Sequence, residues 1–509
     1  MFNLLISGFS VVFSPQMLIL VILAVMLGTL FGALPGVSAT MAVTLGIPFT
    51  YSMAPVQSIV FLVAIYCASI TGGGMTAILF KIPGVPSSAP TTYDGYPMAQ
   101  RGEAGKALGI QLICSAIGGM FAALCMLLLC GPLTTAAVSF GPAELFAIAF
   151  MGLSILTSLD TDNICRTIIS GLIGLLLACI GIDPLLAVPR MTFGFRSLNS
   201  GMEMIPIMIG FFAVTEVLKQ TVKRDKLNAV GEVKQMKTVF PSLLEMLRVK
   251  WTVIRCSIVG TVIGILPGAG ATISAFMCYS MEQKLSKHPE QFGTGCIEGI
   301  AAPETGNNAA TGGSMVPLLS LGIPGGNAAA IMMSALVLKG VQMGPMLLVK
   351  QPQFLSATFA SMFVSNIVMI FAAILLAKMF VQVLRIPYSI LGPTIIMMAT
   401  IGAFATKNIA TDVVTMAIAG LVGFVFITCK FNVSAMILGL VLGTICEANL
   451  RRAYIIADGE TLLATTWNVL KAPLKIAPIP LTAILMIICV VVLVTPGIRT
   501  LLKKRAESK

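Results

Sequence analysis

The sequence predicts an all-α protein that crosses a membrane many times and is built from two repeats. Of its 509 residues 57% are hydrophobic and only 10% are charged, and the mean hydropathy is +0.98. A soluble chain carries about 25% charged residues. No Asp, Glu, Lys or Arg precedes Lys81, and motifs from the first half recur in order in the second half.

Apolar stretches recur along the chain, and about 20 such residues suffice to cross a bilayer as a helix. The clearest lie at 17–34, 54–70, 108–130, 144–159, 168–182 and 202–218, and then at 253–266, 328–349, 355–380, 390–404, 413–429, 435–445 and 484–494. Several are short or interrupted. The pattern therefore predicts a polytopic helical protein.

A basic segment divides these stretches into two groups. Residues 219–250 hold eight Lys or Arg residues and three acids, and the tail "RTLLKKRAESK" has the same bias. Cytoplasmic loops of membrane proteins are rich in Lys and Arg. We therefore expect a first membrane repeat (1–218), a cytoplasmic linker (219–250), a second repeat (251–450), and an extra helix with a cytoplasmic tail (451–509).

The two groups carry matching motifs. "GTLFGALPGVSAT" from Gly28 and "GTVIGILPGAGAT" from Gly260 are identical at eight of thirteen positions. "TGGGM" at Thr71 matches "TGGSM" at Thr311, and an "IPG" tripeptide follows each. If the linker and the tail are both cytoplasmic, each repeat has an odd number of crossings. The two repeats are then inverted, and the first begins outside.

Pro and Gly interrupt the predicted spans at matching places. Backbone groups freed by such breaks cannot face lipid, so the segments must be buried in protein or line a wet cavity. Paired breaks in two halves point to a transporter's binding site, where helix starts attract anions. Small residues whose side chains can donate and accept hydrogen bonds lie near these Pro and Gly interruptions. They are Thr40, Thr44, Thr71, Ser87, Ser88, Ser274, Thr311, Ser314 and Asn327. Close helix packing by small residues is the alternative explanation.

One acid lies between apolar runs in "GIAAPETGNNAATGGSM". An intramembrane carboxylate is a functional candidate. Glu304, with Asn307 and Asn308, is predicted to bind Na⁺ through oxygen ligands or to carry a proton; a cytoplasmic-loop position is the alternative. The scattered cysteines form neither a zinc motif nor a disulfide framework, and no organic cofactor is expected.

Two other function classes remain open. A channel would share the broken half-helices, but it should also show a ring-forming filter motif. A membrane enzyme would need a nucleophile with a base, yet no GxSxG motif occurs and the single histidine, His288, has charged neighbours. "TGGGM" lacks the GK[ST] ending of a P-loop, so ATP-driven transport by this chain is not expected.

Four long motifs resemble the large membrane subunit of tripartite tricarboxylate transporters. They are "GALPGVSATMAVTLGIPFTY", "TGGGMTAILFKIPGVPSSAPTTYDGYPMAQRGEAGKALG", "PRMTFGFRSLNSGMEMIPIMIGFFAVTEVL" and "PETGNNAATGGSMVPLLSLGIPGGNAAAIMMSAL". The resemblance implies a multi-pass symporter of the bacterial inner membrane with about twelve crossings. It also implies a small membrane subunit, a periplasmic solute-binding protein that delivers a carboxylate, and a Na⁺ or H⁺ gradient as the driving force.

The same resemblance implies which positions face the substrate. They belong to the TGG and IPG motifs of both repeats, which we expect to form broken or re-entrant hairpins. The candidates are Thr71, Gly72, Gly73, Gly74, Pro83, Gly84, Ser87 and Ser88, and Thr311, Gly312, Gly313, Ser314, Pro324, Gly325, Gly326 and Asn327.

Overall fold

The computed structural model confirms the all-α class. It describes residues 2–34, 36–159, 164–183, 188–195, 198–199, 201–223, 240–383, 388–457, 461–471 and 480–507. Residues 224–239 of the predicted linker and the last two residues of the predicted tail lie outside the described residues.

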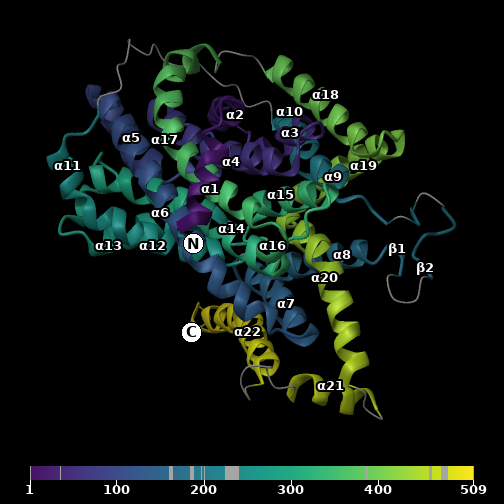
Figure 1. The fold of residues 1–509 in the computed structure, drawn as a ribbon. Coiled ribbons are helices and arrows are strands. Elements are labelled where there is room, and N and C mark those ends of the chain that lie inside the picture. Colours follow the sequence, from purple (N-terminus) through teal and green to yellow (C-terminus); the bar gives the residue numbers. More distant parts are fainter. Residues whose placement is uncertain are drawn as a thin grey trace.

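The helices of the first half begin close to the expected stretches. They are α1 (Phe2–Val12), α2 (Pro15–Ala33), α3 (Ala39–Thr50), α4 (Pro55–Phe80), α5 (Thr91–Met98), α6 (Ala104–Val138), α7 (Pro142–Leu159), α8 (Ile164–Ala178), α9 (Met204–Ile209) and α10 (Thr215–Lys223). A 3₁₀ turn, η1 (Pro86–Ser88), precedes α5, and π turns η2 (Ala99–Glu103) and η4 (Gly210–Val214) lead into α6 and α10. Strands β1 (Gly181–Ile182) and β2 (Pro189–Arg190) pair antiparallel beyond α8 (Figure 1).

The second half continues the same pattern. Its elements are α11 (Leu243–Arg248), α12 (Lys250–Ile265), α13 (Gly270–Leu285), η5 (Pro289–Gln291), α14 (Ile297–Leu321), α15 (Asn327–Leu338), α16 (Met346–Lys350), α17 (Pro352–Val383), α18 (Tyr388–Lys407), α19 (Ala410–Thr428), α20 (Val433–Ala457), α21 (Leu462–Lys471) and α22 (Leu481–Glu507).

Length and composition identify eight membrane-spanning candidates among the described residues. They begin at Pro15, Pro55, Thr91, Met204, Pro352, Ser389, Ala410 and Val433. Shorter apolar helices, such as Ala39–Thr50 and Asn327–Leu338, lie between them. The fold is that of a polytopic membrane protein, while the count of about twelve crossings stays a prediction.

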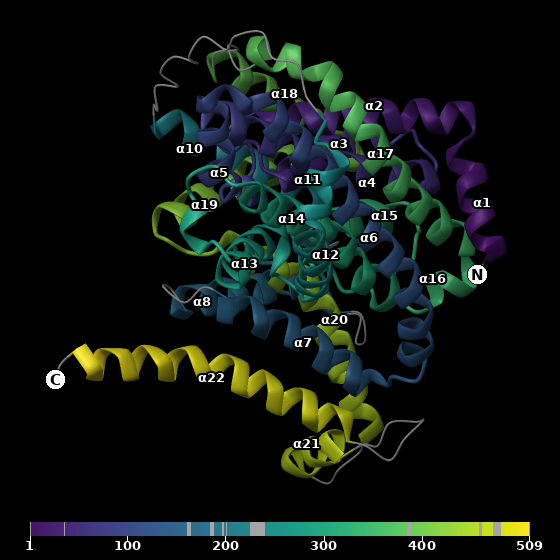
Figure 2. The same ribbon diagram turned by 90° about the vertical axis from the view of Figure 1, so that its left-hand side faces the viewer.

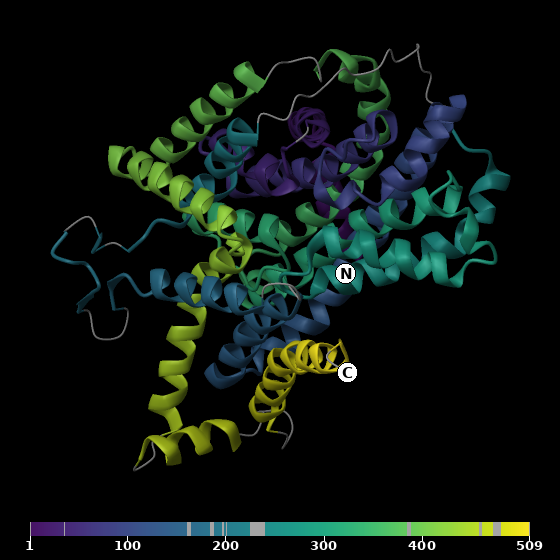
Figure 3. The same ribbon diagram turned by 180° about the vertical axis from the view of Figure 1, so that it is seen from behind.

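Helix α14 lies at the centre of the molecule. It packs on α6, α12 and α13, while α4 packs on α2 and α17 (Figures 1 and 2). The predicted repeats therefore interlock, because α4 and α6 of the first contact α14 of the second. Helix α22 runs along α7, and α20 carries α21 away from this core (Figures 2 and 3).

A buried carboxylate fixes α5 to the loop that precedes α14. Asp94 Oδ1 accepts hydrogen bonds from the backbone N–H groups of Gly293, Gly295 and Cys296 at 2.8–3.0 Å. The Tyr279 hydroxyl donates to Asp94 Oδ2 at 2.8 Å. Four donors satisfy this acid, so its role is to position α5 against the second half.

Candidate functional site

The LPG motifs form sharp turns between helices. In the first, α2 ends at Ala33, Gly36 has a φ of 87°, and α3 follows. In the second, α12 ends at Ile265, Gly268 has a φ of 83°, and α13 follows. L-residues with side chains rarely adopt such φ values, so the two corresponding turns require glycine.

The IPG motifs fold back onto the helices that precede them. The Gly84 N–H donates to Gly73 O at 3.3 Å, and the Gly325 N–H donates to Ser314 O at 3.4 Å. A Cβ at Gly84 would lie 2.0 Å from the carbonyl oxygen of Gly32, and one at Gly325 would lie 2.4 Å from that of Gly264. Both loops are thus wedged between two helices, where only glycine fits.

The TGG motifs lie inside continuous helices, so the expected breaks come later in the chain than the motifs. Thr71–Gly74 belongs to α4 and Thr311–Ser314 to α14, and all of these residues are buried. A Cβ at Gly72 would lie 2.3 Å from Thr29 O, and one at Gly313 would lie 2.3 Å from Thr261 O. These glycines permit close helix packing, the alternative that the sequence left open.

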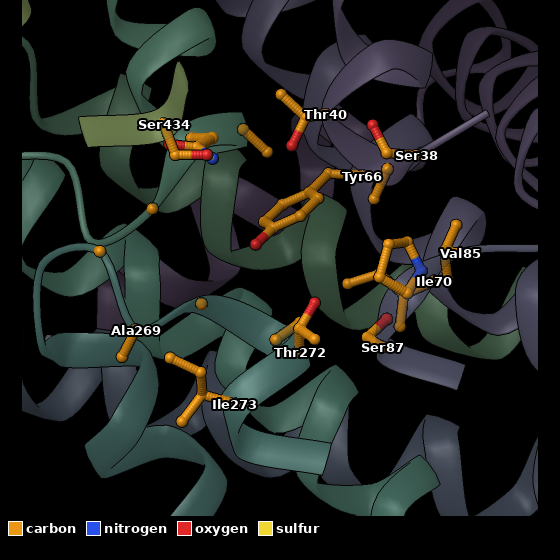
Figure 4. A pocket seen from close by; sticks show the side chains of 18 of the residues that line it. Ser38, Thr40, Tyr66, Ile70, Val85, Ser87, Ala269, Thr272, Ile273 and Ser434 are labelled. Carbon is orange, nitrogen blue, oxygen red and sulfur yellow. The ribbon is translucent and has the colours of Figure 1, made fainter. Parts of the chain in front are cut away.

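A cavity of about 510 Å³ opens where the turns of both halves meet (Figure 4). Helices α3, α13, α15 and α20 all begin at it. Its lining comprises Ser38, Ala39, Thr40, Tyr66, Ile70, Val85, Pro86, Ser87, Phe212, Gly268, Ala269, Gly270, Ala271, Thr272, Ile273, Gly326, Asn327, Ala328, Asn432 and Ser434. Among the predicted substrate-facing residues, Ser87, Gly326 and Asn327 lie in this lining.

The electrostatic character of the cavity comes from its helix starts. None of the lining residues carries a formal charge. Each helix start presents N–H groups and the positive end of its dipole. Helices α13 and α15 have no side-chain cap, so their first N–H groups are available to a ligand. This arrangement favours an anion without a fixed cation.

Polar side chains surround the same space. The Tyr66 hydroxyl points into it between Ser434 and Thr272 (Figure 4). Asn327 Nδ2 donates to Ser434 Oγ at 2.7 Å and thereby joins the starts of α15 and α20. Ser38, Tyr66, Thr272, Asn432 and Ser434 also line the cavity but were not predicted from the sequence. N-cap patterns signalled two of them, Ser38 and Asn432. Ser38 Oγ accepts from Met41 N at 3.1 Å, and Asn432 Oδ1 accepts from Ala435 N at 3.2 Å.

Glu304 lies away from the cavity lining, in the middle of α14, and is fully buried. Thr91 Oγ1 donates to its Oε1 at 2.5 Å. Ser115 Oγ and Gln111 Nε2 donate to its Oε2 at 3.0 and 3.2 Å. A Cβ at Gly74 would lie 2.6 Å from Glu304 Oε1, so the absence of a side chain there makes room for the carboxylate.

The two asparagines, three and four residues after Glu304 on α14, contact the first TGG motif and the cavity wall. Asn308 Nδ2 donates to Thr71 Oγ1 at 3.1 Å, and Asn307 Nδ2 donates to Ser87 O at 3.4 Å. Ser87 lines the cavity. The structure therefore brings Glu304, Asn307 and Asn308 together with part of the first TGG motif.

Three residues related to Glu304 carry a buried oxygen that has no hydrogen-bond partner among the described residues. They are Gln111, which bonds Glu304 through its Nε2, Thr305, the next residue in the chain, and Asn308, one turn later on α14. Oxygen atoms of this kind suit a hard cation such as Na⁺. Within the described ranges no group of three or more His, Cys, Asp or Glu residues gathers as a metal site.

Comparison with known proteins identifies the family. Residues 18–438 match the model of the tripartite tricarboxylate transporter TctA family. An Agrobacterium vitis protein described as an uncharacterized 52.8 kDa protein in the TAR-I ttuC' 3' region is 35% identical over 493 residues, which cover 97% of this chain and 96% of that protein.

A second Agrobacterium vitis protein, described as uncharacterized and in the TAR-II ttuC' 3' region, is 36% identical over 241 residues. These residues cover 47% of this chain and 96% of that protein. No solved structure matches the chain significantly. The match over residues 18–438 shows that this chain belongs to the TctA family of tripartite tricarboxylate transporters.

Proposed function

We propose that this chain is the translocating subunit of a bacterial inner-membrane symporter and that it binds a di- or tricarboxylate in the cavity where α3, α13, α15 and α20 begin. The observation that carries the proposal is the convergence of four helix starts on a cavity whose lining has no charged residue. Helix starts hold carboxylates and phosphates through backbone N–H groups.

The driving ion acts at Glu304. Moving a multiply charged anion through an apolar core is costly unless its charge is compensated. Glu304 supplies a buried, titratable oxygen pair, and Gln111, Thr305 and Asn308 supply the unpaired oxygens beside it. Either Na⁺ or H⁺ fits this set, with Asn307 and Asn308 as further ligands or as links to the cavity.

The coupling runs through the segment η1–α5. Its first residues, Pro86 and Ser87, line the cavity, and Thr91 bonds the Glu304 carboxylate. Loading or emptying of the ion site changes the Thr91 contact and therefore shifts the cavity wall. The corresponding turns and wedged loops of the two halves support inverted repeats as the framework for this movement.

Two partners complete the transporter. A small membrane subunit accompanies the chain, and a periplasmic solute-binding protein delivers the carboxylate. The decisive experiment is uptake of citrate and of succinate by the reconstituted complex, with the Na⁺ and pH gradients varied independently. Gradient-dependent accumulation that requires the binding protein supports the proposal.

Equal uptake with and without either gradient would indicate a channel instead. High-affinity uptake by this chain alone would contradict the tripartite arrangement and leave the transport function intact.

A further inference from the structure

A second chamber lies on the far side of the helices that line the substrate cavity. One part has a volume of about 340 Å³ and the other about 480 Å³. Both parts are lined by Met202, Met204 and Thr444, so they adjoin. The proposed function assigns no role to this space.

The same three segments line both the substrate cavity and the second chamber. Helix α15 lines the cavity at Ala328 and the chamber at Met333. Helix α20 lines the cavity at Ser434 and the chamber at Leu440. The segment α9–η4 lines the chamber from Met204 and the cavity at Phe212. Helices α9, α15 and α20 contact one another in pairs (Figure 1).

A thin apolar layer separates the two spaces. The two linings are five residues apart on α15, from Ala328 to Met333, and six residues apart on α20, from Ser434 to Leu440. At 1.5 Å per residue these separations are about 7.5–9 Å. The side chains of this layer are buried on all three segments: Ile207, Met208 and Ile209, then Ala329, Ala330, Ile331 and Met332, and then Ala435, Met436, Ile437 and Leu438. A carboxylate cannot cross such a layer unless the layer opens.

One contact lies at the chamber end of the layer. Ser334 Oγ lies 3.6 Å from Met204 Sδ and 3.6 Å from Met208 Sδ, so α15 meets α9 through a hydroxyl and two thioethers. Methionine side chains are flexible and repack easily, and thioether sulfur is a weak acceptor. The π turn η4 directly follows α9, and π turns frequently occur at functional sites. This contact is therefore easier to break than a contact between packed aliphatic side chains.

The chamber is lined by charged groups, whereas the substrate cavity has none. Arg190 and Glu447 line one part and Glu203 lines the other, and the Arg190 guanidinium pairs with Glu447 and Asp183. The Arg190 Nε is buried without a hydrogen-bond partner among the described residues. Buried unpaired donors are rare in native proteins, and a passing carboxylate oxygen would satisfy this one.

Resting on the proposed function, we infer that the second chamber is the opposite mouth of the transport path and that Met204, Met208 and Ser334 form its gate, here called the methionine gate. The carboxylate passes between the cavity and the chamber when α9 and α15 separate. Beyond the gate it meets Glu203 in one part of the chamber and Arg190 with Glu447 in the other.

The test cross-links the gate in the reconstituted complex. In Met208→Cys/Ser334→Cys, Cd²⁺ should bridge the two thiols and reduce citrate or succinate uptake to a few per cent, while binding of the same carboxylate to the complex persists. Removal of Cd²⁺ with EDTA should restore uptake. Wild type and each single variant, treated in the same way, control for the native cysteines.

Bridged protein that transports normally overturns the gate, and so does failure of Cd²⁺ to bridge the pair, because the two helices would then not meet as described. Loss of carboxylate binding in Gly326→Val tests the cavity separately, so failure of the proposed function is distinguishable. A second variant pair, Met204→Ala/Met208→Ala, should increase carboxylate leak without a gradient at least about tenfold. If carboxylate leak does not increase in Met204→Ala/Met208→Ala, the gate is also contradicted.

Discussion

The proposed substrate cavity and the Glu304 cluster are both polar, but they are built in opposite ways. The cavity is an open space at helix starts, where backbone N–H groups are available to a ligand and no lining residue is charged. The Glu304 cluster lies in mid-helix, where three side chains donate to one carboxylate. Backbone donors suit an anion, whereas a carboxylate beside unpaired oxygens suits a cation or proton. The proposed function therefore places two sites for opposite charges in one fold.

The largest expected effect is the loss of accumulation when the charge of Glu304 is removed, while the cavity still binds carboxylate. Glu304→Gln keeps the size of the side chain but removes the charge that a cation or proton needs. We expect gradient-driven accumulation to be lost, while carboxylate binding to detergent-solubilised protein is retained. Uptake under imposed gradients and equilibrium binding measure the two quantities separately.

Glu144 provides the matched control, because it is also a buried carboxylate. Its Oε2 accepts from Gly141 N at 2.8 Å, and its Oε1 accepts from the Thr482 hydroxyl at 3.2 Å. A glutamine oxygen can keep one of these roles, so Glu144→Gln should transport normally. Unchanged accumulation in Glu304→Gln would show that the driving ion does not act at Glu304.

The next effect tests the cavity by filling it. Gly326 has an extended backbone, and a Cβ there would meet nothing closer than 3.8 Å. Gly326→Val should therefore fold, yet its side chain blocks the approach of the carboxylate to the start of α15. The loss of one charged hydrogen bond weakens binding about 10- to 150-fold. Titration of carboxylate binding measures this loss.

Substitutions at two other glycines serve as controls for Gly326→Val. Gly131 also has open space around it but lies outside the cavity lining, so Gly131→Val should bind normally. Gly325 is wedged against Gly264 O, so Gly325→Val should reduce the yield of folded protein. Normal binding by Gly326→Val would show that the ligand does not approach α15.

The sequence predicted the broken turns of the site better than its lining. Pro and Gly spacing located the LPG and IPG turns because a positive φ or a wedged loop demands glycine, as at Gly36 and Gly84. The TGG glycines look the same in the sequence but serve helix packing, because contact between distant helices decides the role of a glycine.

Glu304 was recognisable as an acid within an apolar run, whereas its donors were not. Thr91, Gln111 and Ser115 come from α5 and α6, and only the tertiary fold brings them to α14. Tyr66 and Ser434 were missed for the same reason. A hydroxyl on a buried helix has no local pattern that tells which side faces a cavity.

A smaller effect concerns one side-chain amide of the cavity. Asn327→Ala removes a lining donor and the 2.7 Å bond to Ser434 without changing any charge. A neutral hydrogen bond contributes about 0.5–1.5 kcal/mol, so half-maximal uptake should require about 2- to 12-fold more carboxylate. Concentration-dependent uptake measures the change. An altered ion dependence with unchanged carboxylate affinity would place Asn327 with the Glu304 cluster instead.

The smallest effect is expected at a surface pair that belongs to neither site. Lys106 Nζ lies 2.5 Å from Glu245 Oε1, and this hydrogen bond lowers the pKa of Glu245 to about 2. A lowered pKa contributes stability above the ordinary carboxyl value, and that stability is lost only as pH falls toward 2. Glu245 stays charged between pH 5 and 8, which are about the limits of maximal stability in proteins.

Glu245→Gln should therefore leave the pH profile of uptake unchanged in this range, whereas Glu304→Gln should flatten it if H⁺ is the driving ion. A shifted profile in Glu245→Gln, measured in proteoliposomes with the same imposed gradient at each pH, would mean that titration outside the core also controls transport.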